Sequence, residues 1–201
     1  MRKSIVAALA GAALTLTALT LTALTLAAIP AQAAWKSYVN KELGFTFMAP
    51  GEVKTDVGNS RGAIAGPRQS IVYRSIEDSI EYKVTVLSFI QAQAEGATLL
   101  GERQYMFQDR KKVLLDAFSR AETGKDTVYG RKIVVEQPDN KGRTTGVFYF
   151  TKGRMFALEA TVLPGRGNAA TPDPDRFIES IAFVLSRTAP DAIELMTPEL
   201  E

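Results

Sequence analysis

The sequence predicts an α+β fold in which an antiparallel β-sheet is flanked by helices. Two observations carry this prediction. Apolar and polar side chains alternate along several short runs, which is the pattern of strands with one buried face. Over residues 98–118 the apolar spacing becomes that of an amphipathic helix. Because short turn motifs separate the runs, we expect neighbouring strands to be antiparallel.

The first strands are predicted in the N-terminal half. Residues 44–47 alternate apolar and polar side chains and are followed by a Pro-Gly turn. Residues 69–76 and 79–89 alternate in the same way. Because Glu77-Asp78 is the short connection between these two runs, we expect them to form a β-hairpin.

Residues 98–118 form the predicted long helix. Leu100, Phe107 and Leu114 follow one another at seven-residue spacing, which places them on one face of a helix. We expect this apolar face to pack on the sheet. The charged residues of the segment are expected on the opposite, solvated face. They are Glu102, Arg103, Asp109, Arg110, Lys111 and Asp116.

Three further β-rich runs follow, at 127–136, 143–151 and 154–162. The connections between them are short and contain glycine, so we expect an antiparallel meander. In the last run every second residue is apolar, and the residues between are mixed. We therefore expect one face of this strand to be covered.

A second, shorter helix is predicted near the C-terminus. Asp173 is placed to cap it, with Pro174 at its first position. Its expected buried stripe consists of Phe177, Ile181, Val184 and Leu185. Residues 188–201 contain four acidic side chains, no basic ones and two prolines, so we expect a flexible acidic tail. A single folded domain is therefore expected over residues 34–187.

Residues 1–33 have the features of a secretory signal peptide. Two basic residues follow the first methionine, and a long uncharged stretch follows them. Ala31 and Ala33 form an A-x-A motif, which predicts cleavage before Ala34 and a periplasmic or secreted protein without stable membrane insertion. Because the apolar segment 5–29 is long enough for a membrane span, an uncleaved anchor is the alternative.

The composition excludes several classes of function. The sequence has no histidine and no cysteine, which removes the commonest general base, the thiolate nucleophile, disulfides and the usual ligands of zinc and copper. The formal net charge is +2, and removal of Arg2 and Lys3 with the signal peptide leaves none. A basic surface for nucleic acid is therefore not expected.

Three segments resemble landmarks of PsbP-like domains. They are GFTFMAP at 44–50, RMFALEA at 154–160 and FIESIAF at 177–183. With Trp35-Lys36-Ser37-Tyr38, they make residues 35–187 similar to conserved exported proteins of unknown function in alphaproteobacteria. The resemblance implies an α/β/α sandwich that serves as a binding or assembly module. The matching positions are core and turn positions, so no functional residue is carried over.

One motif is typical of hydrolases. Gly58-Asn59-Ser60-Arg61-Gly62 matches G-x-S-x-G, the nucleophile elbow of α/β-hydrolases. The elbow needs a helix after the serine and a histidine to take its proton. The following residues 63–67 include Gly66-Pro67, and no histidine exists. We therefore interpret the motif as a flexible loop between strands and assign no catalytic residue.

Two other clusters are weak candidates for ligand binding. An anion-binding loop would consist of Gly165, Arg166 and Gly167. A calcium site would consist of Asp173, Asp175 and Glu179. A plain surface loop explains the first cluster, and helix capping with dipole complementarity explains the second. We therefore assign no metal ligand and no cofactor.

Tyrosines near lysines on the predicted strands are the last candidates. They are Tyr73, Tyr82, Tyr129 and Tyr149, near Lys83 and Lys132. A Tyr–Lys pair can perform acid–base chemistry where burial lowers the lysine pKa. At these spacings, such residues are more often ordinary members of a sheet.

Two classes of function therefore remain. The first is an exported, non-catalytic module that binds a protein partner or a small apolar ligand in the cell envelope. The second is a hydrolase or lyase that uses carboxylates or a Ser/Tyr/Lys set in place of histidine. A deep pocket with converging carboxylates or a buried lysine would favour the enzyme, whereas a filled sheet face with shallow grooves would favour the module.

Overall fold

The computed structural model describes residues 34–62, 66–89, 94–124, 126–138, 142–164 and 170–199. The chain divides into two units between Gln32 and Ala33, and all described residues belong to the second unit. Ala34, the predicted first residue after cleavage, is the first described residue, whereas Ala31 and Ala33 lie outside the described residues. No helix in the described part of the chain has the length and apolar character needed to span a bilayer.

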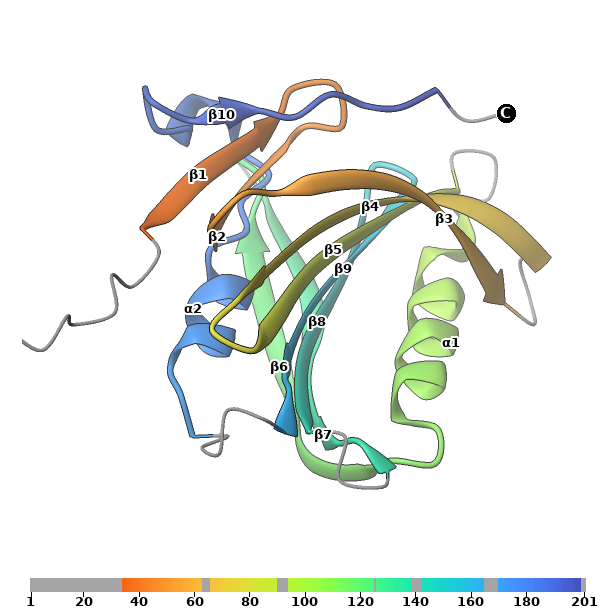
Figure 1. The fold of residues 1–201 in the computed structure, drawn as a ribbon. Coiled ribbons are helices and arrows are strands. Elements are labelled where there is room, and N and C mark those ends of the chain that lie inside the picture. Colours follow the sequence, from red (N-terminus) through yellow and green to blue (C-terminus); the bar gives the residue numbers. More distant parts are fainter. Residues whose placement is uncertain are drawn as a thin grey trace, which may run out of the picture. The chain divides into compact units, whose positions relative to one another are not determined.

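The second unit is built on a seven-stranded antiparallel sheet (Figure 1). The strand order is β3-β4-β5-β9-β8-β7-β6. These strands are β3 (Lys54–Gly62), β4 (Gly66–Glu77), β5 (Ile80–Ser88), β6 (Lys112–Glu122), β7 (Thr127–Glu136), β8 (Arg143–Thr151) and β9 (Arg154–Val162). A smaller sheet has the order β10-β1-β2, with β1 (Trp35–Asn40), β2 (Phe45–Pro50) and β10 (Ile193–Glu194).

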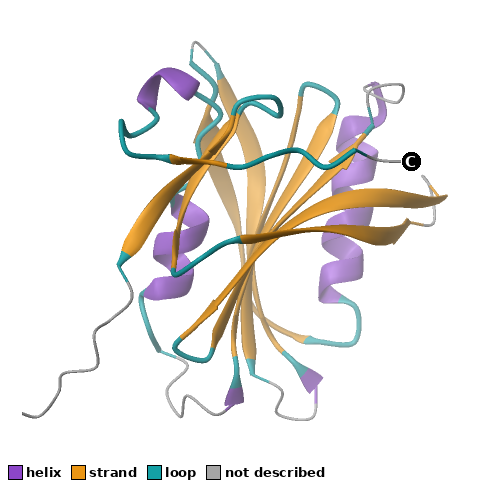
Figure 2. Ribbon diagram, turned by 45° about the horizontal axis from the view of Figure 1, so that its top comes forward, coloured by secondary structure: helices purple, strands orange, loops and turns teal. Residues whose placement is uncertain are grey.

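Helix α1 (Gly96–Gln108) lies on one face of the large sheet, and helix α2 (Asp173–Glu179) lies on the other face (Figures 1 and 2). The strands β1 and β2 lie on the same side as α2. The described elements therefore form mostly antiparallel sheet with two helices. The predicted flanking of the sheet by helices is correct in outline, but it overstates the helical layers.

Tight turns explain the hairpins of the large sheet. Asp78 and Ser79 connect β4 to β5 with positive φ angles of 49° and 58°. Lys152 and Gly153 connect β8 to β9 with φ angles of 49° and 70°. Two consecutive left-handed residues form the turn whose twist matches that of the strands. The predicted hairpin through Glu77-Asp78 is confirmed, and the turn itself lies one residue further on.

The predicted helix over 98–118 is wrong in its second half. Helix α1 ends at Gln108, and Arg110 takes a left-handed φ of 55° before β6 begins at Lys112. Leu114 therefore lies on β6 and is 39% exposed, so it does not continue the apolar face of Leu100 and Phe107. The seven-residue apolar spacing continues through both halves of the segment. The second half forms a strand because it pairs with β7, a contact between residues far apart in the sequence.

Both faces of β9 are buried. Phe156 and Leu158 face α2 and the small sheet, within the larger hydrophobic core. Met155, Ala157 and Glu159 point to the side of α1 and are buried as well. Helix α1 thus covers the second face of this central strand.

Glycine allows α1 to approach the sheet closely. A Cβ on Gly96 would lie 2.5 Å from two ring carbons of Phe150. A Cβ on Gly146 would lie 2.9 Å from the Phe107 ring and 3.1 Å from the Phe148 ring. The Phe107 and Phe148 rings pack edge to face, with centroids 5.0 Å apart. These contacts fix α1 over β8.

The C-terminal elements differ from the prediction at two points. Helix α2 begins at Asp173 itself, with Pro172 at the cap position, and ends at Glu179. The expected stripe therefore breaks up, because Ile181 is buried outside the helix and Leu185 is exposed. Residues 188–201 were expected as a flexible tail.

Part of that tail is docked on the small sheet. Strand β10 pairs in parallel with β1, and the buried Leu195 donates its N–H to the Val39 carbonyl at 2.8 Å. The Asn40 amide donates to the Leu195 carbonyl at 3.1 Å and to Thr197 Oγ1 at 2.9 Å. A flexible tail is therefore the wrong description of residues 193–197.

Candidate functional site

A buried carboxylate lies on the α1 side of the large sheet. Glu159 of β9 is directly opposite Lys83 of β5, so the two side chains share one face. The Glu159 side chain forms ion pairs with the Lys83 ammonium and with Nη2 of Arg103, the latter at 2.9 Å. Glu159 is only 7% exposed. The register of the sheet and the position of α1 together assemble this cluster.

Glu159 is held in its ionised form. Burial alone would raise the pKa of this carboxyl, because a charge is poorly solvated away from water. The positive charges of Lys83 and Arg103 outweigh that effect, so the pKa of Glu159 lies below its usual value. The side chain is therefore a fixed negative charge at neutral pH.

A third cation, Lys111, closes the cluster from the turn after α1. Its ammonium donates to the Phe107 carbonyl at 2.7 Å and lies 4.7 Å from the centre of the Phe107 ring. Burial lowers the pKa of Lys111, and the nearby positive charges of Arg103 and Lys83 lower it further. The negative charge of Glu159 raises this pKa but does not outweigh these effects. Arg103 and Lys111 were predicted on a solvated helix face. That prediction is wrong for both.

Neutral polar groups form the opposite wall. Thr144 of β8 is opposite Thr161 of β9, and their hydroxyls lie 2.9 Å apart. The Gln137 amide donates to Thr144 Oγ1 at 2.6 Å. Together with Glu81 and Phe107, these residues and the charged cluster line an open pocket of about 390 Å³.

The pocket carries surplus positive charge. Three cations, Lys83, Arg103 and Lys111, face the single buried carboxylate of Glu159. Glu81 on the rim is already paired with Arg74 at 2.9 Å. Within the described residues, no group accepts a hydrogen bond from the buried Nε of Arg103. This arrangement suits a carboxylate, phosphate or sulfate group.

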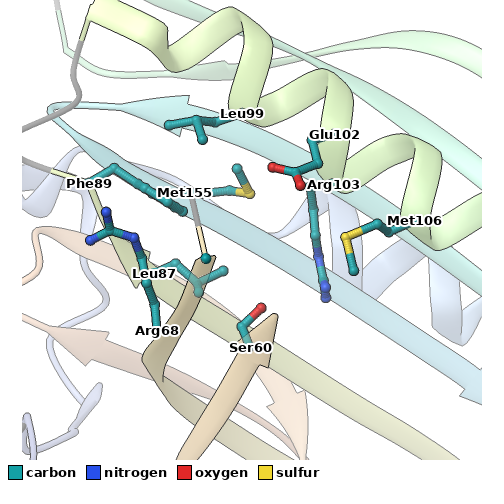
Figure 3. Close-up of a pocket in the computed structure, with 10 residues that line it drawn as sticks. Ser60, Arg68, Leu87, Phe89, Leu99, Glu102, Arg103, Met106 and Met155 are labelled. Atoms are coloured by element: carbon teal, nitrogen blue, oxygen red, sulfur yellow. The ribbon is translucent and has the colours of Figure 1, made fainter. Parts of the chain in front are cut away.

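A second, apolar pocket lies along the same helix (Figure 3). It is lined by Leu99 of α1 and by Leu87 and Met155 of the sheet, and the Arg68 guanidinium lies 5.0 Å from the centre of the Phe89 ring. Its free volume of about 30 Å³ is much smaller than that of the pocket beside Glu159.

Ser60 lines that small pocket and is not on a nucleophile elbow. The segment Gly58–Gly62 is the end of strand β3, so the expected flexible loop is wrong. Gly62 pairs directly with Gly66 of β4, the next described element, which is a strand and not a helix. The strand-to-helix turn of a nucleophile elbow is therefore not present among the described residues here.

The predicted anion-binding loop and the predicted calcium site have different outcomes. Gly165, Arg166 and Gly167 lie outside the described residues. For the calcium candidate, the Lys132 ammonium lies 3.0 Å from Asp175 and 3.2 Å from Glu179. Within the described residues, no group of three or more potential ligands is arranged to hold a metal ion. Lys132 therefore forms ion pairs with two of the carboxylates that a calcium ion would need as ligands.

The tyrosines and lysines of the strands have separate partners. The Tyr73 hydroxyl accepts a 2.9 Å hydrogen bond from Asn40, and burial raises the pKa of Tyr73 to about 12. The Tyr149 hydroxyl lies 2.6 Å from the Ser119 hydroxyl, and burial raises the pKa of Tyr149 as well. Tyr129 is exposed. The raised pKa values keep the Tyr73 and Tyr149 hydroxyls protonated at neutral pH, so these two are poor general bases.

Sequence reasoning did not identify the Glu159 cluster. One signal was present: Glu159 is the only charged residue between Met155 and Val162 in an otherwise apolar or neutral strand. A carboxylate at such a position needs a partner. The identity of the partners depends on the strand register and on α1, which no local pattern reveals.

Comparison with known proteins gives a structural similarity and no sequence match. No family model and no curated protein sequence matches this chain. Among solved structures it is similar to a cyanobacterial PsbP (CyanoP) from Synechocystis sp. PCC 6803. The two are 14% identical, with a TM-score of 0.44, over 74% of this chain and 92% of the other. At that level the similarity carries no argument about activity, ligand or partner.

Proposed function

We propose that this protein is an exported, non-catalytic binding module whose pocket beside Glu159 holds an anionic group. One observation carries the proposal: Lys83 and Arg103 pair with the buried Glu159 carboxylate, and Lys111 lines the same open pocket of about 390 Å³ as a third cation. The local surplus of positive charge attracts a carboxylate, phosphate or sulfate. Arg103 presents a buried Nε donor, and the threonine wall adds hydroxyl groups.

Binding fits these residues better than catalysis. Glu159 is ionised and tied to two cations, so it is a poor general acid. The Thr144 and Thr161 hydroxyls bond to each other, and a threonine nucleophile would need a neighbouring base. The sequence contains no histidine that could serve as that base.

Export and a PsbP-like fold belong to the same proposal. The signal-peptide features of residues 1–33 support a periplasmic or secreted location. The three PsbP-like segments support a binding or assembly role, with the anionic group supplied by a partner protein or a small molecule of the cell envelope. The alternative of a small apolar ligand has less support, because the apolar pocket along α1 is much smaller than the pocket beside Glu159.

Calorimetric titration with inorganic phosphate tests the anion site. We expect saturable binding to the wild type and roughly tenfold weaker binding to Lys111→Gln. Lys112→Gln is the matched control, because Lys112 is the next residue, is exposed and pairs with Glu136 on the surface. We expect Glu159→Gln to bind phosphate more tightly, because it removes the negative charge from the pocket.

The pH dependence of sulfate binding gives an independent check. Sulfate keeps its charge through the alkaline range, so only the protein titrates. Because the pKa of Lys111 lies below its usual value of 10.5, sulfate affinity should fall as the pH rises through that lowered pKa.

Equal phosphate affinity in the wild type and Lys111→Gln, or no measurable binding to either, would refute the proposed site.

Lys111 is also the observation that favours the alternative, a lyase or hydrolase without histidine. A lysine with a lowered pKa can act as a base or as an amine nucleophile. Borohydride reduction in the presence of small aldehydes and ketones would trap an adduct on Lys111, and not on Lys112, if this amine forms Schiff bases. We expect no such selectivity.

A further inference from the structure

The outer side of strand β6 is an open edge of the large sheet. Among the strands of the described residues, β6 pairs with β7 alone. Its exposed large apolar side chains are Val113, Leu114, Leu115 and Phe118, with exposed fractions from 39% to 84%. An apolar edge strand of this length is a template for pairing with another strand.

The opposite edge, β3, has a different character. Its sequence KTDVGNSRG contains two glycines and one large apolar residue, Val57. Glycine weakens a strand and offers no side chain for packing. Strand β6, with the sequence KVLLDAFSRAE, contains neither glycine nor proline. The large sheet therefore has one edge suited to strand pairing.

Two hydrogen bonds show which backbone groups of β6 point outwards. The Thr123 N–H donates to the Asp126 carbonyl at 2.9 Å, so Thr123 faces β7. The Phe183 N–H donates to the Glu122 carbonyl at 3.1 Å, so Glu122 faces the outer side. In an antiparallel strand, both backbone groups of a residue point to one side, and the side alternates along the chain. Every second residue before Glu122 therefore faces outwards.

The outward-facing backbone groups belong to Arg120, Phe118 and Asp116. The bulge in β6 lies N-terminal to these residues, so the alternation is unbroken. The segment around Phe183 already occupies the C-terminal end of the edge. The free part of the edge is therefore centred close to Phe118.

Charge complementarity selects one register for a second copy. A twofold axis at Phe118 places Asp116 of each copy opposite Arg120 of the other copy and brings the two Phe118 rings together. Opposite charges across an antiparallel pair stabilise it, and like charges destabilise it. Among the neighbouring registers, those centred on 116, 119 and 120 oppose like charges. The register centred on 117 would place Lys112 opposite Glu122, at the end of the edge where the Phe183 N–H already binds the Glu122 carbonyl.

The side chains are available for these contacts. Arg131 Nε donates to Asp116 Oδ1 at 2.8 Å, and Arg131 Nη2 lies 2.7 Å from the same oxygen, while Oδ2 accepts a long 3.4 Å hydrogen bond from Gln108. Oδ2 can therefore accept from Arg120 of a second copy. The Arg131 guanidinium lies 4.9 Å from the centre of the Phe118 ring, which is 84% exposed.

We propose that a second copy of this chain pairs with β6 about a twofold axis at Phe118, so that two seven-stranded sheets join into one antiparallel sheet. The contact uses the outward backbone groups of three residues per copy, two Asp116–Arg120 ion pairs and the stacked Phe118 rings. This inference does not depend on the anion site, which lies elsewhere on the α1 face.

Cysteine cross-linking tests the axis directly, because the chain has no cysteine of its own. Directly opposite residues of a hydrogen-bonded antiparallel pair have Cα atoms about 5.5 Å apart, which is within disulfide range. Phe118→Cys should therefore form a disulfide-linked dimer under mild oxidation. Arg120→Cys is the matched control: its two copies lie roughly 13 Å apart across the axis and should not cross-link.

A charge exchange tests the register without relying on a single variant. Arg120→Glu and Asp116→Lys each place like charges opposite one another, so each variant alone should dimerise roughly tenfold more weakly by analytical ultracentrifugation. Mixing the two variants restores both opposite pairs and should restore the dimer. Lys36→Glu, on the exposed side of β1, is the control and should dimerise like the wild type.

Three results would overturn the proposal. The first is a wild type that stays monomeric at concentrations on the order of 100 μM, because its dimer dissociation constant would then be too high for a specific strand pairing. The second is Arg120→Cys cross-linking as readily as Phe118→Cys. The third is a mixture of the two charge variants that dimerises no better than either variant alone.

Discussion

Glu159→Gln is the most informative single substitution at the candidate site. Glutamine keeps the size and shape of the side chain and removes only its charge. Lys83 and Arg103 then lose the carboxylate that both of them bind, Arg103 at 2.9 Å. The variant therefore measures how much of the folding free energy depends on the ionised carboxylate.

The expected loss follows from the burial of the three groups. Removing one partner of a fully buried ion pair costs about 3–5 kcal/mol, because an unpaired charge remains away from water. Here the Lys83 and Arg103 side chains are 27% and 22% exposed, so water recovers part of that cost. Exposed pairs contribute about 1 kcal/mol or less, so we expect a loss of about 2–3 kcal/mol at neutral pH.

The loss should depend on pH. The pKa of Glu159 is lowered in the folded protein below the usual value of 4.5, so the folded state binds this proton less readily than the unfolded state. The stabilisation is therefore complete above about pH 4.5 and is lost as the pH falls through the lowered folded pKa. Glutamine does not titrate, so the stabilities of the wild type and the variant should converge in acid.

Urea unfolding followed by fluorescence provides the assay. Trp35 is the only tryptophan, and its ring packs against Tyr82 and under the Arg176 guanidinium, so its emission should change on unfolding. Glu136→Gln is the control, because Glu136 pairs with Lys112 on the surface and should cost at most about 1 kcal/mol. A loss below about 0.5 kcal/mol for Glu159→Gln, or a loss that does not vary with pH, would refute this account.

Two further predictions concern α1 and the N-terminus. Phe107→Ala should lower the unfolding free energy by about 3–5 kcal/mol, because the ring is buried against Phe148, whereas Tyr105→Ala, 73% exposed on the same helix, should change it by roughly 0.5 kcal/mol or less. Similar small losses in urea unfolding at both positions would contradict the orientation of α1. Intact-mass analysis of the exported protein should give a chain that begins at Ala34, and a membrane-bound chain that retains residues 1–33 would establish the anchor instead.

The hairpins of the large sheet could be predicted from sequence because their determinants are local. Alternation over 69–76 and 79–89 defines the two strands, and a two-residue turn joins them. The end of α1 could not be predicted in this way. The apolar spacing continues from Phe107 to Leu114, and only the pairing of β6 with β7 shows that Leu114 belongs to a strand.

The tail illustrates the same limit. Its composition is acidic and contains two prolines, which is typical of a flexible segment. Its docking depends on Leu195 entering the core and on the Asn40 amide, which lies 155 residues away in the sequence. A single apolar side chain within a polar segment is too weak a signal to predict such a contact.

The candidate site was missed for a related reason. The polar side of β5 was visible in the sequence as Glu81, Lys83 and Thr85, but its pairing with Glu159 requires the register between β5 and β9. Arg103 and Lys111 were predicted to lie on the solvated face of the helix. Helical periodicity does not show which side of a helix lies over a polar part of the sheet. The two lysines and the arginine therefore meet only in three dimensions.

Stability alone does not explain why this part of the sheet carries charges. Apolar residues of similar size at the positions of Lys83, Arg103 and Glu159 would pack about as well, since buried ion pairs add little or nothing over well-packed apolar side chains. The remainder of the α1 face, around Phe107 and Phe148, is built in that apolar way. The charged cluster instead keeps three cations pointed at an open pocket, with one carboxylate fixing the positions of two of them. The cluster thus retains more positive than negative charge beside the pocket, at a cost in folding stability, which is what the proposed anion site requires.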